Sequence, residues 1–462
     1  MSRSDPGRAR AAGGQPTRRA TPAPARAVAV RVLERVETEA AFADLTLDAE
    51  LARHPLAPRD VALATELVYG TLRWQRYLDW IVAPHSKRRL AALDVRVRVL
   101  FRLTAYQLTF LERIPAFAAV NDAVTLARSA PGVAEYVNAV LRAFARRGAA
   151  EREPMPPRDA TDALATRCSF PTWLAARWIA RYGRDAATAL MRALDERPPL
   201  AVRANTLRTS RDTLIERLRV EDGVAARPAR LAPEGLIVEG GGAPGRWRTF
   251  GEGACVVQDE ASMLVARLLD PEPGATIVDA CAAPGTKTTH LAQLMDDRGR
   301  IIALDPQPGR LGRVAEAAMR LGVTIVDSVE GLVEELAPRW AGAADGVLVD
   351  APCTNLGVVR RNPEVKWRRQ PADVVAAAER QRRILTAAAT LVKSGGRLVY
   401  ATCSLEPEEN DDVVRAFLDG HRDFGVDTPA AFPVAPDSDG FVRFLPHVHG
   451  TDGFTAIRLR RR

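Results

Sequence analysis

Residues 279–294, DACAAPGTKTTHLAQL, join a predicted strand to a predicted helix through an unusual loop. The apolar run 275–278 before this stretch has the length of a short strand. Leu291, Leu294 and Met295, at and just beyond the end of the stretch, recur at helical spacing. A strand that leads directly into a helix is the repeating unit of α/β domains. We therefore expect an α/β domain in this part of the chain.

The loop between them predicts a site for a small polar ligand. Asp279 ends the strand, Pro284 and Gly285 turn the backbone, and the free amide groups of a new helix favour a polar or anionic ligand. A Walker A loop would need glycine in place of Cys281 and Thr286, and a dinucleotide fingerprint would need three spaced glycines. The sequence fits neither of these nucleotide-binding motifs.

Strands and helices alternate after Gly274, which predicts a parallel sheet that binds its ligand at the carboxyl ends of the strands. Polar residues end several of these strands: Asp279, Asp305, Asp327, Asp350 and the trio Thr402, Cys403 and Ser404. Asp305 lies 20 residues after Gly285, close to the separation expected of a carboxylate that binds ribose hydroxyls. Asp327 is placed either to accept from an adenine amino group or to cap a helix beginning near Val329.

A second motif, DAPCTNLG at 350–357, continues into the basic segment VVRRNPEVKW. The proline beside Cys353 at a strand end is expected to expose the thiol instead of burying it in a helix. Phosphate contacts and one stacking surface are predicted for Arg360, Arg361, Lys366, Trp367, Arg368 and Arg369. A solvated basic loop is the alternative interpretation.

Composition places the chain among ordinary globular proteins. Its 462 residues are enough for two or three domains, and 47% are hydrophobic while 26% are charged. No apolar run approaches the roughly 18 residues of a membrane span, and no secretory segment opens the chain. We expect a cytoplasmic protein without a membrane partner. Its five cysteines are widely spaced and lack a CxxC pair, which predicts reduced thiols and no metal site.

The net charge of +8 is concentrated at the N-terminus, where residues 1–26 hold six arginines against one aspartate. Residues 1–25 have almost no large apolar side chains, so they cannot form a core and are predicted to be a disordered basic tail. A mobile arginine-rich tail is suited to attracting phosphate backbones. This favours a nucleic-acid partner over a plain solvated surface.

Four further regions follow the tail. Helical periodicity predicts an all-helical bundle over residues 26–148, and the polar, proline-rich residues 149–159 predict a linker. Residues 160–250 predict a small α+β module for substrate binding, in which Arg203 points outward from a short strand. Residues 251–462 hold the alternating strands and helices.

Both halves of the chain resemble known families. The helical region resembles the NusB family of RNA-binding domains through its AxxVLxxV opening, ELVYGTLRW, AVNDAV and VNAVLR, which implies contact with RNA or protein. The second half resembles the RNA cytosine-5 methyltransferases of the NOL/NOP/Sun family through DACAAPGTKT, DAPCTNLGVVRRNPEVKW, VYATCSLEPEEN and VVQDEAS. Together the two halves resemble the members that methylate small-subunit ribosomal RNA.

This resemblance implies a class I, Rossmann-like methyltransferase domain with S-adenosylmethionine as its cofactor. It assigns cofactor binding to Cys281, Ala282, Ala283, Pro284, Gly285, Thr286, Lys287, Asp305, Arg310, Asp327 and Asp350.

The resemblance also assigns catalysis to four side chains. Cytosine C5 is a poor nucleophile, so a thiolate must add at C6 before C5 can take a methyl group. Cys403 would attack C6, and Cys353 would assist release of the enzyme. Asp350 would bond the N3 and amino edge of the cytosine, while Lys287 would orient Asp350 or stabilise the adduct.

The chain departs from the family pattern at two places. Thr286 stands where the family usually has the second glycine of Gly-Gly-Lys, and Thr354 with Asn355 replaces the Ser-Gly of Cys-Ser-Gly. A β-branched side chain where the backbone approaches the cofactor affects the geometry of the loop. Cofactor binding is nevertheless expected to survive.

The expected partner is small-subunit ribosomal RNA that presents an unstacked or loop cytosine to a monomeric enzyme. Transfer RNA is an alternative substrate for the same chemistry. A non-catalytic, NusB-like RNA-binding or antitermination factor is the alternative of another class, and the intact Cys353, Cys403, Asp350 and Lys287 argue against it.

Overall fold

The computed structural model describes residues 24–127, 131–147 and 153–462, which divide into the compact units Met1–Pro156 and Pro157–Arg462. Most of the predicted tail and part of the predicted linker lie outside the described residues. Pro24 and Ala25, assigned above to the tail, belong to the first helix, in which Ala25 is buried. No helix among the described residues is long and apolar enough to cross a membrane.

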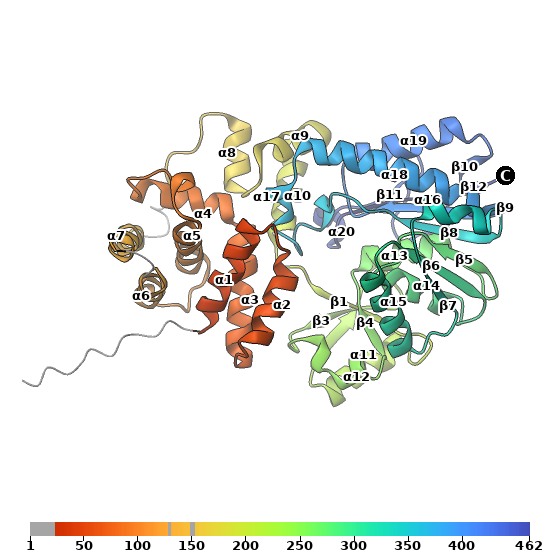
Figure 1. The fold of residues 1–462 in the computed structure, drawn as a ribbon, viewed down its shortest axis with the longest axis horizontal. Coiled ribbons are helices and arrows are strands. Elements are labelled where there is room, and N and C mark those ends of the chain that lie inside the picture. Colours follow the sequence, from red (N-terminus) through yellow and green to blue (C-terminus); the bar gives the residue numbers. More distant parts are fainter. Residues whose placement is uncertain (1–23, 128–130, 148–152) are drawn as a thin grey trace, which may run out of the picture. The chain divides into compact units, whose positions relative to one another are not determined.

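The first unit is helical, as the periodicity predicts (Figure 1). Its α-helices are α1 (Pro24–Thr38), α2 (Ala43–Arg53), α3 (Pro58–Arg73), α4 (Gln75–Val82), α5 (Val95–Phe110), α6 (Ala116–Leu126) and α7 (Val133–Ala145). Helix α5 contacts α1, α3, α4, α6 and α7. It therefore carries buried residues on most of its surface, including Leu100, Phe101 and Leu103.

The second unit begins with three helices, α8 (Ala160–Arg167), α9 (Thr172–Tyr182) and α10 (Arg184–Asp195). Their apolar faces share one hydrophobic cluster with Leu356, Val365 and Leu405, which come from the connections after β8 and β9, far along the chain. These helices therefore pack on the connections that carry the DAPCTNLG motif and the segment after Cys403.

A small antiparallel sheet follows, with strand order β2-β3-β1-β4. Its strands are β1 (Leu200–Ala204), β2 (Ala225–Pro228), β3 (Gly235–Glu239) and β4 (Cys255–Val257), and its helices are α11 (Arg211–Glu221) and α12 (Arg248–Gly251). Strand β4 lies beyond residue 250, the predicted end of the module.

The large sheet has the order β10-β12-β9-β8-β5-β6-β7, and β11 pairs with β12. Its strands are β5 (Thr276–Asp279), β6 (Arg300–Asp305), β7 (Val326–Glu330), β8 (Ala344–Asp350), β9 (Val392–Thr402), β10 (Phe424–Val426), β11 (Val442–Phe444) and β12 (Phe454–Arg461). Strands β5 to β9 are parallel, which confirms the predicted α/β class, whereas β12 runs antiparallel to β9 and makes the sheet mixed.

Helices cover both faces of this sheet (Figure 1). Ile277 packs with α13 (Glu260–Leu269), α14 (Thr286–Leu294) and α15 (Pro308–Leu321), whereas its neighbour Val278 packs with α16 (Val333–Leu336), α18 (Pro371–Leu391) and α19 (Asp411–Gly420). Side chains alternate between the faces of a strand, so a sheet covered on both faces needs continuous apolar strands. The short helices α17 (Val365–Arg368) and α20 (Pro446–His449) lie in the connections.

Candidate active site

Three of the predicted strand-end carboxylates meet at one edge of the large sheet. Asp279, Asp305 and Asp350 are the last residues of β5, β6 and β8. Strand β8 pairs with both β5 and β9, and Cys403 follows β9 directly. Since these strands are parallel, their carboxyl ends form the edge where ligands of such sheets bind.

The loop between β5 and α14 has its most constrained residue at Gly285. Gly285 has a φ of +99°, and an added Cβ would lie 3.0 Å from the Cα of Val314, so a larger residue is disfavoured there. Thr286 is the first residue of α14, and its carbonyl accepts a hydrogen bond of 2.7 Å from Arg203 Nη1. The departure at Thr286 therefore falls on helical backbone, which a β-branched residue can adopt.

Arg203 is buried, contrary to the prediction that it points outward. It comes from β1, an inner strand of the small sheet, and donates to Gln258, to the Thr286 carbonyl and to Thr289 Oγ1. Side chains alternate between the two faces of a strand, and the face of β1 that was expected to meet solvent is covered by α14. Arg203 thus ties the small sheet to the start of the helix that follows the cofactor loop.

Asp279 presents a carboxylate oxygen at the base of this loop. Its Oδ2 accepts from Thr288 Oγ1 at 2.7 Å, while its buried Oδ1 has no hydrogen-bond partner among the described residues. Burial raises the pKa of Asp279 to about 6. A buried carboxylate oxygen of this kind favours a cationic or hydrogen-donating ligand.

Asp305 and Arg310 lie together beside the loop. Arg310 Nη1 is 3.3 Å from Asp305 Oδ2, and Arg310 Nη2 donates to the carbonyl of Ala283 at 3.0 Å. Asp305 Oδ1 accepts from the backbone N–H of Gln307 at 3.0 Å. Arg310 thus connects the loop to the second strand, and its guanidinium faces protein atoms of the site.

The prediction for Asp327 is wrong. Strand β7 is Val326–Glu330, so Asp327 is its second residue, and it pairs at 2.6 Å with Arg300, the first residue of β6. This contact is at the amino edge of the sheet, opposite the site. The residue in register with Asp305 is Glu330, which is exposed. The apolar run 323–326 had suggested a strand that ends three residues too early.

Lys287 and Asp350 form a partly buried ion pair. Lys287 Nζ lies 2.6 Å from Asp350 Oδ2 and 5.0 Å from the ring centre of Phe454. Lys287 comes from the first turn of α14 and Asp350 from the end of β8. The pair joins the predicted cofactor loop to the predicted catalytic loop, so one carboxylate can serve both.

Cys353 and Cys403 are brought together from loops 50 residues apart, with their sulfurs 3.0 Å from each other. The pKa of Cys353 lies well above its usual range, first because of its hydrogen bond with Cys403 and second because of burial. Cys353 therefore holds its proton and can donate it toward the Cys403 sulfur. This arrangement suits a pair of thiols in which one attacks and the other supplies a proton.

Glu409 joins the two cysteine loops and was not singled out in the sequence. It is fully buried and accepts hydrogen bonds from the backbone N–H and hydroxyl of Thr354 and from the hydroxyl of Ser404. Each of these partners is adjacent to a cysteine. Gln381 of α18 also donates to Glu409, at 3.1 Å. The EPEEN sequence after Cys403 contains three glutamates, of which Glu406 and Glu409 are buried, and no local pattern distinguishes the one that joins the cysteine loops.

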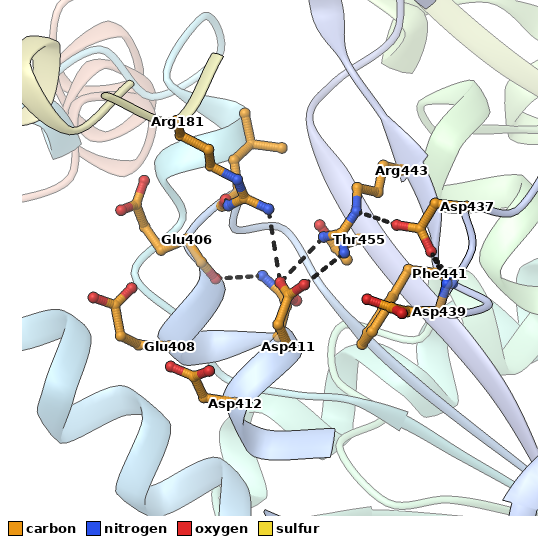
Figure 2. Close-up of polar contacts among 12 residues, drawn as sticks. Arg181, Glu406, Glu408, Asp411, Asp412, Asp437, Asp439, Phe441, Arg443 and Thr455 are labelled. Carbon is orange, nitrogen blue, oxygen red and sulfur yellow. Dashed lines mark hydrogen bonds and ion pairs between the residues drawn. The ribbon is translucent and has the colours of Figure 1, made fainter. Parts of the chain in front are cut away.

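Helix α9 holds the chain that follows Cys403. Arg177 Nε donates to Glu406 at 2.6 Å, Trp178 Nε1 donates to the same carboxylate at 2.9 Å, and Arg181 donates to the Leu405 carbonyl. Figure 2 shows Arg181 and Arg443 approaching Asp411, and Arg443 continues to Asp437.

Glu406 and Asp411, two of the acidic side chains in Figure 2, therefore neutralise the charges of Arg177 and Arg443 within the protein. Carboxylate–guanidinium pairs of this kind fix the loop after Cys403 against α9 and the start of α19 against β11.

Three side chains of the predicted RNA-binding segment are tied into the protein instead. Arg360 and Arg361 bond Asp452 at 2.6 Å and 2.5 Å, and Lys366, which is fully buried, lies 2.7 Å from Asp195. A cation that is buried must be paired, so these charges hold the loop in place. The prediction of phosphate contacts is wrong for Arg360 and Lys366, whose charged ends do not reach solvent.

Three family models match this chain. One described as 16S rRNA methyltransferase RsmB/F matches residues 266–460, and one described as the NusB family matches 23–146. A third, the ferredoxin-like domain of RsmF/B-like methyltransferases, matches 170–243.

Named relatives match along nearly the whole chain. Probable ribosomal RNA small subunit methyltransferase B of Bacillus subtilis is 36% identical and covers 95% of this chain and 98% of its own length. Ribosomal RNA small subunit methyltransferase B of Pseudomonas putida is 34% identical, with coverage of 94% and 98%.

Solved structures also match. The crystal structure of PH0851 has a TM-score of 0.82 at 29% identity and covers 96% of this chain and all 100% of that one. NSun6 from Pyrococcus horikoshii with SFG, an S-adenosylmethionine analogue, has a TM-score of 0.58 at 27% identity, covering 63% of this chain and 98% of that one.

Proposed function

Because the chain belongs to the RsmB/F family of 16S rRNA methyltransferases, we propose that it methylates C5 of one cytosine in small-subunit ribosomal RNA. The chain is an RNA methyltransferase and S-adenosylmethionine is its methyl donor. The observation that carries the finer proposal is the contact of 3.0 Å between the sulfurs of Cys353 and Cys403, beside the Asp350–Lys287 pair.

The residues at the sheet edge fit the cofactor. The loop from Cys281 to Lys287 leads into the start of α14, whose backbone amide groups favour a polar ligand, and we assign Asp305, at the end of β6, to the ribose hydroxyls. The unpartnered Oδ1 of Asp279 fits the ammonium group of a bound amino acid moiety. S-adenosylmethionine, when bound, supplies a methyl group on a positively charged sulfur.

The reaction proposed for the two cysteines begins with the Cys403 thiolate. Its sulfur bonds to C6 of the cytosine, and the electrons of the C5–C6 double bond move toward N3 and make C5 nucleophilic. Asp350 accepts from the amino edge of the base, and Lys287 holds that carboxylate in place. C5 then takes the methyl group, and the donor is left as a neutral thioether. A water molecule acting as base takes the C5 proton, the electrons of the C5–H bond restore the C5–C6 double bond, and Cys403 leaves C6 as a thiolate.

Cys353 is proposed to act in the last of these steps. Its raised pKa keeps it protonated, and its sulfur lies in hydrogen-bond contact with that of Cys403. The proton of Cys353 can therefore stabilise the sulfur that leaves C6. A thiol can approach C6 only from above the ring, so the target cytosine must be unstacked.

We also propose a NusB-like RNA-binding domain that begins with α1, a linker at 149–159, a substrate module from residue 160 through β4, and a methyltransferase domain from α13 to residue 462. The protein is proposed to be monomeric and cytoplasmic.

The function is tested by transfer of labelled methyl groups to candidate RNAs. We expect 5-methylcytosine at one position of protein-free small-subunit ribosomal RNA, mapped by bisulfite sequencing, and no labelling of transfer RNA. Labelling of transfer RNA alone would contradict the proposed substrate, and labelling of a base other than cytosine would contradict the proposed chemistry. Folded protein that binds S-adenosylmethionine without transferring a methyl group would favour a non-catalytic RNA-binding factor.

Glu330 replaces Asp327 in the proposed cofactor site, because it is in register with Asp305 at the carboxyl edge. We expect Glu330→Gln to weaken S-adenosylmethionine binding about three- to tenfold, because a charged acceptor for the adenine amino group becomes a neutral one. The measurement is the Kd from calorimetry.

The matched control is Asp327→Asn, which removes a carboxylate from the same strand at the opposite edge. Its Kd should equal that of the parent protein. Weaker binding by this variant, with no effect of Glu330→Gln, would restore Asp327 to the site and contradict the register argument.

A further inference from the structure

Asn355 contacts both reactive sulfurs. Its Oδ1 lies 3.0 Å from Cys403 Sγ and 3.3 Å from Cys353 Sγ, and the side chain is partly buried. Its backbone has a φ of +63°, in the left-handed region that glycine adopts most easily. Asparagine is the side chain that tolerates this conformation better than most others, so the loop can gain an amide without losing its shape.

A carboxamide can serve a thiol and a thiolate in turn. Its oxygen accepts a hydrogen bond from S–H, and its amino group donates to a negatively charged sulfur. With Oδ1 toward the sulfurs, the structure corresponds to protonated thiols. A half-turn about the terminal torsion of Asn355 would bring Nδ2 to the same place when a sulfur loses its proton.

The other charged and titratable groups around the sulfurs have partners of their own. Lys287 pairs with Asp350, and Arg369 donates to the Thr354 carbonyl. The Glu409 carboxylate accepts from the hydroxyls of Thr354 and Ser404. Tyr400 donates to the backbone carbonyl of Glu409. Glu409 is a negative group near Cys353 and adds to the rise of its pKa. A thiolate formed here needs a donor to offset burial and this negative charge.

We propose that Asn355 is a further catalytic residue, whose amide accepts from the resting Cys403 thiol and donates to the thiolate that attacks C6. The proposal rests on the proposed function for the identity of the nucleophile. The backbone N–H of Asn355 also acts on this pair, since it lowers the pKa of Cys353. The residue thus offers two donors to the sulfurs from a single position.

A purely structural role is the alternative, in which Asn355 only satisfies the left-handed backbone. Two variants separate the roles. Asn355→Gly keeps the backbone conformation and removes the amide, while Asn355→Asp keeps the shape and replaces the donor by an anionic acceptor. The structural role predicts a harmless or stabilising glycine variant.

The test measures how fast iodoacetamide alkylates Cys403 in the full-length protein at each pH, with the modified residue identified by mass spectrometry. Alkylation follows the thiolate fraction. We expect the midpoint to rise by about one pH unit in Asn355→Gly, which is about tenfold less thiolate at neutral pH, and further in Asn355→Asp. Single-turnover methyl transfer should shift along the same pH axis, with an unchanged Kd for S-adenosylmethionine.

An unchanged midpoint in both variants would overturn the proposal. So would a rate loss accompanied by an equal loss of thermal stability, since that is the mark of a structural role. Alkylation needs no RNA, so the test of Asn355 holds even if the parent protein labels no ribosomal RNA. That second result would contradict the proposed function separately.

Discussion

Cys403→Ala is expected to lower the single-turnover rate of methyl transfer by a factor on the order of 10⁴ to 10⁶. Without a sulfur at this position, no bond forms to C6 and C5 stays a poor nucleophile. The neighbouring Cys353 is not expected to replace it, because burial and the nearby Glu409 still raise its pKa when the hydrogen bond with Cys403 is gone. The measurement is incorporation of labelled methyl groups into the RNA.

Cys168→Ala is the matched control for this loss. Cys168 is buried among the residues of α8 to α10, and burial raises its pKa to about 11, so it is an inert thiol. Its replacement should leave the transfer rate within about threefold of the parent, while both variants bind S-adenosylmethionine equally. Substantial methyl transfer by Cys403→Ala would move the nucleophile to another residue.

Cys353→Ala is expected to trap the enzyme on its RNA. This variant keeps Cys403 and can form the bond to C6, but it lacks the thiol that lies 3.0 Å from the leaving sulfur. Release then slows more than attack does, and a covalent protein–RNA complex accumulates in the presence of S-adenosylmethionine. A denaturing gel should show this complex as a slowly migrating band that disappears on RNase treatment.

The double variant Cys353→Ala/Cys403→Ala controls for non-specific retention of RNA and should show no band. The two single variants together also test the assignment of roles. A covalent complex with Cys403→Ala and none with Cys353→Ala would reverse it, making Cys353 the nucleophile.

The amino-acid sequence determined the parts of this protein that depend on local chemistry. Alternating strands and helices specify the α/β class, because each period follows from backbone geometry over a few residues. Asp279, Asp305 and Asp350 could be placed at strand ends because each directly follows its own apolar run. The motif around Gly285 specifies its turn, since few residues adopt a φ of +99°.

The tertiary structure decided where distant residues meet. The register between β6 and β7 places Asp327 near the amino edge of the large sheet and Glu330 at the carboxyl edge, where the site lies. An apolar run in the sequence does not show where a strand ends relative to its neighbour. Arg203, Arg360 and Lys366 are buried, contrary to their predicted exposure. A buried charge needs a partner, and that partner can come from any part of the chain. The same long-range packing put Asn355 within 3.0 Å of a sulfur 48 residues away, which no local spacing predicts.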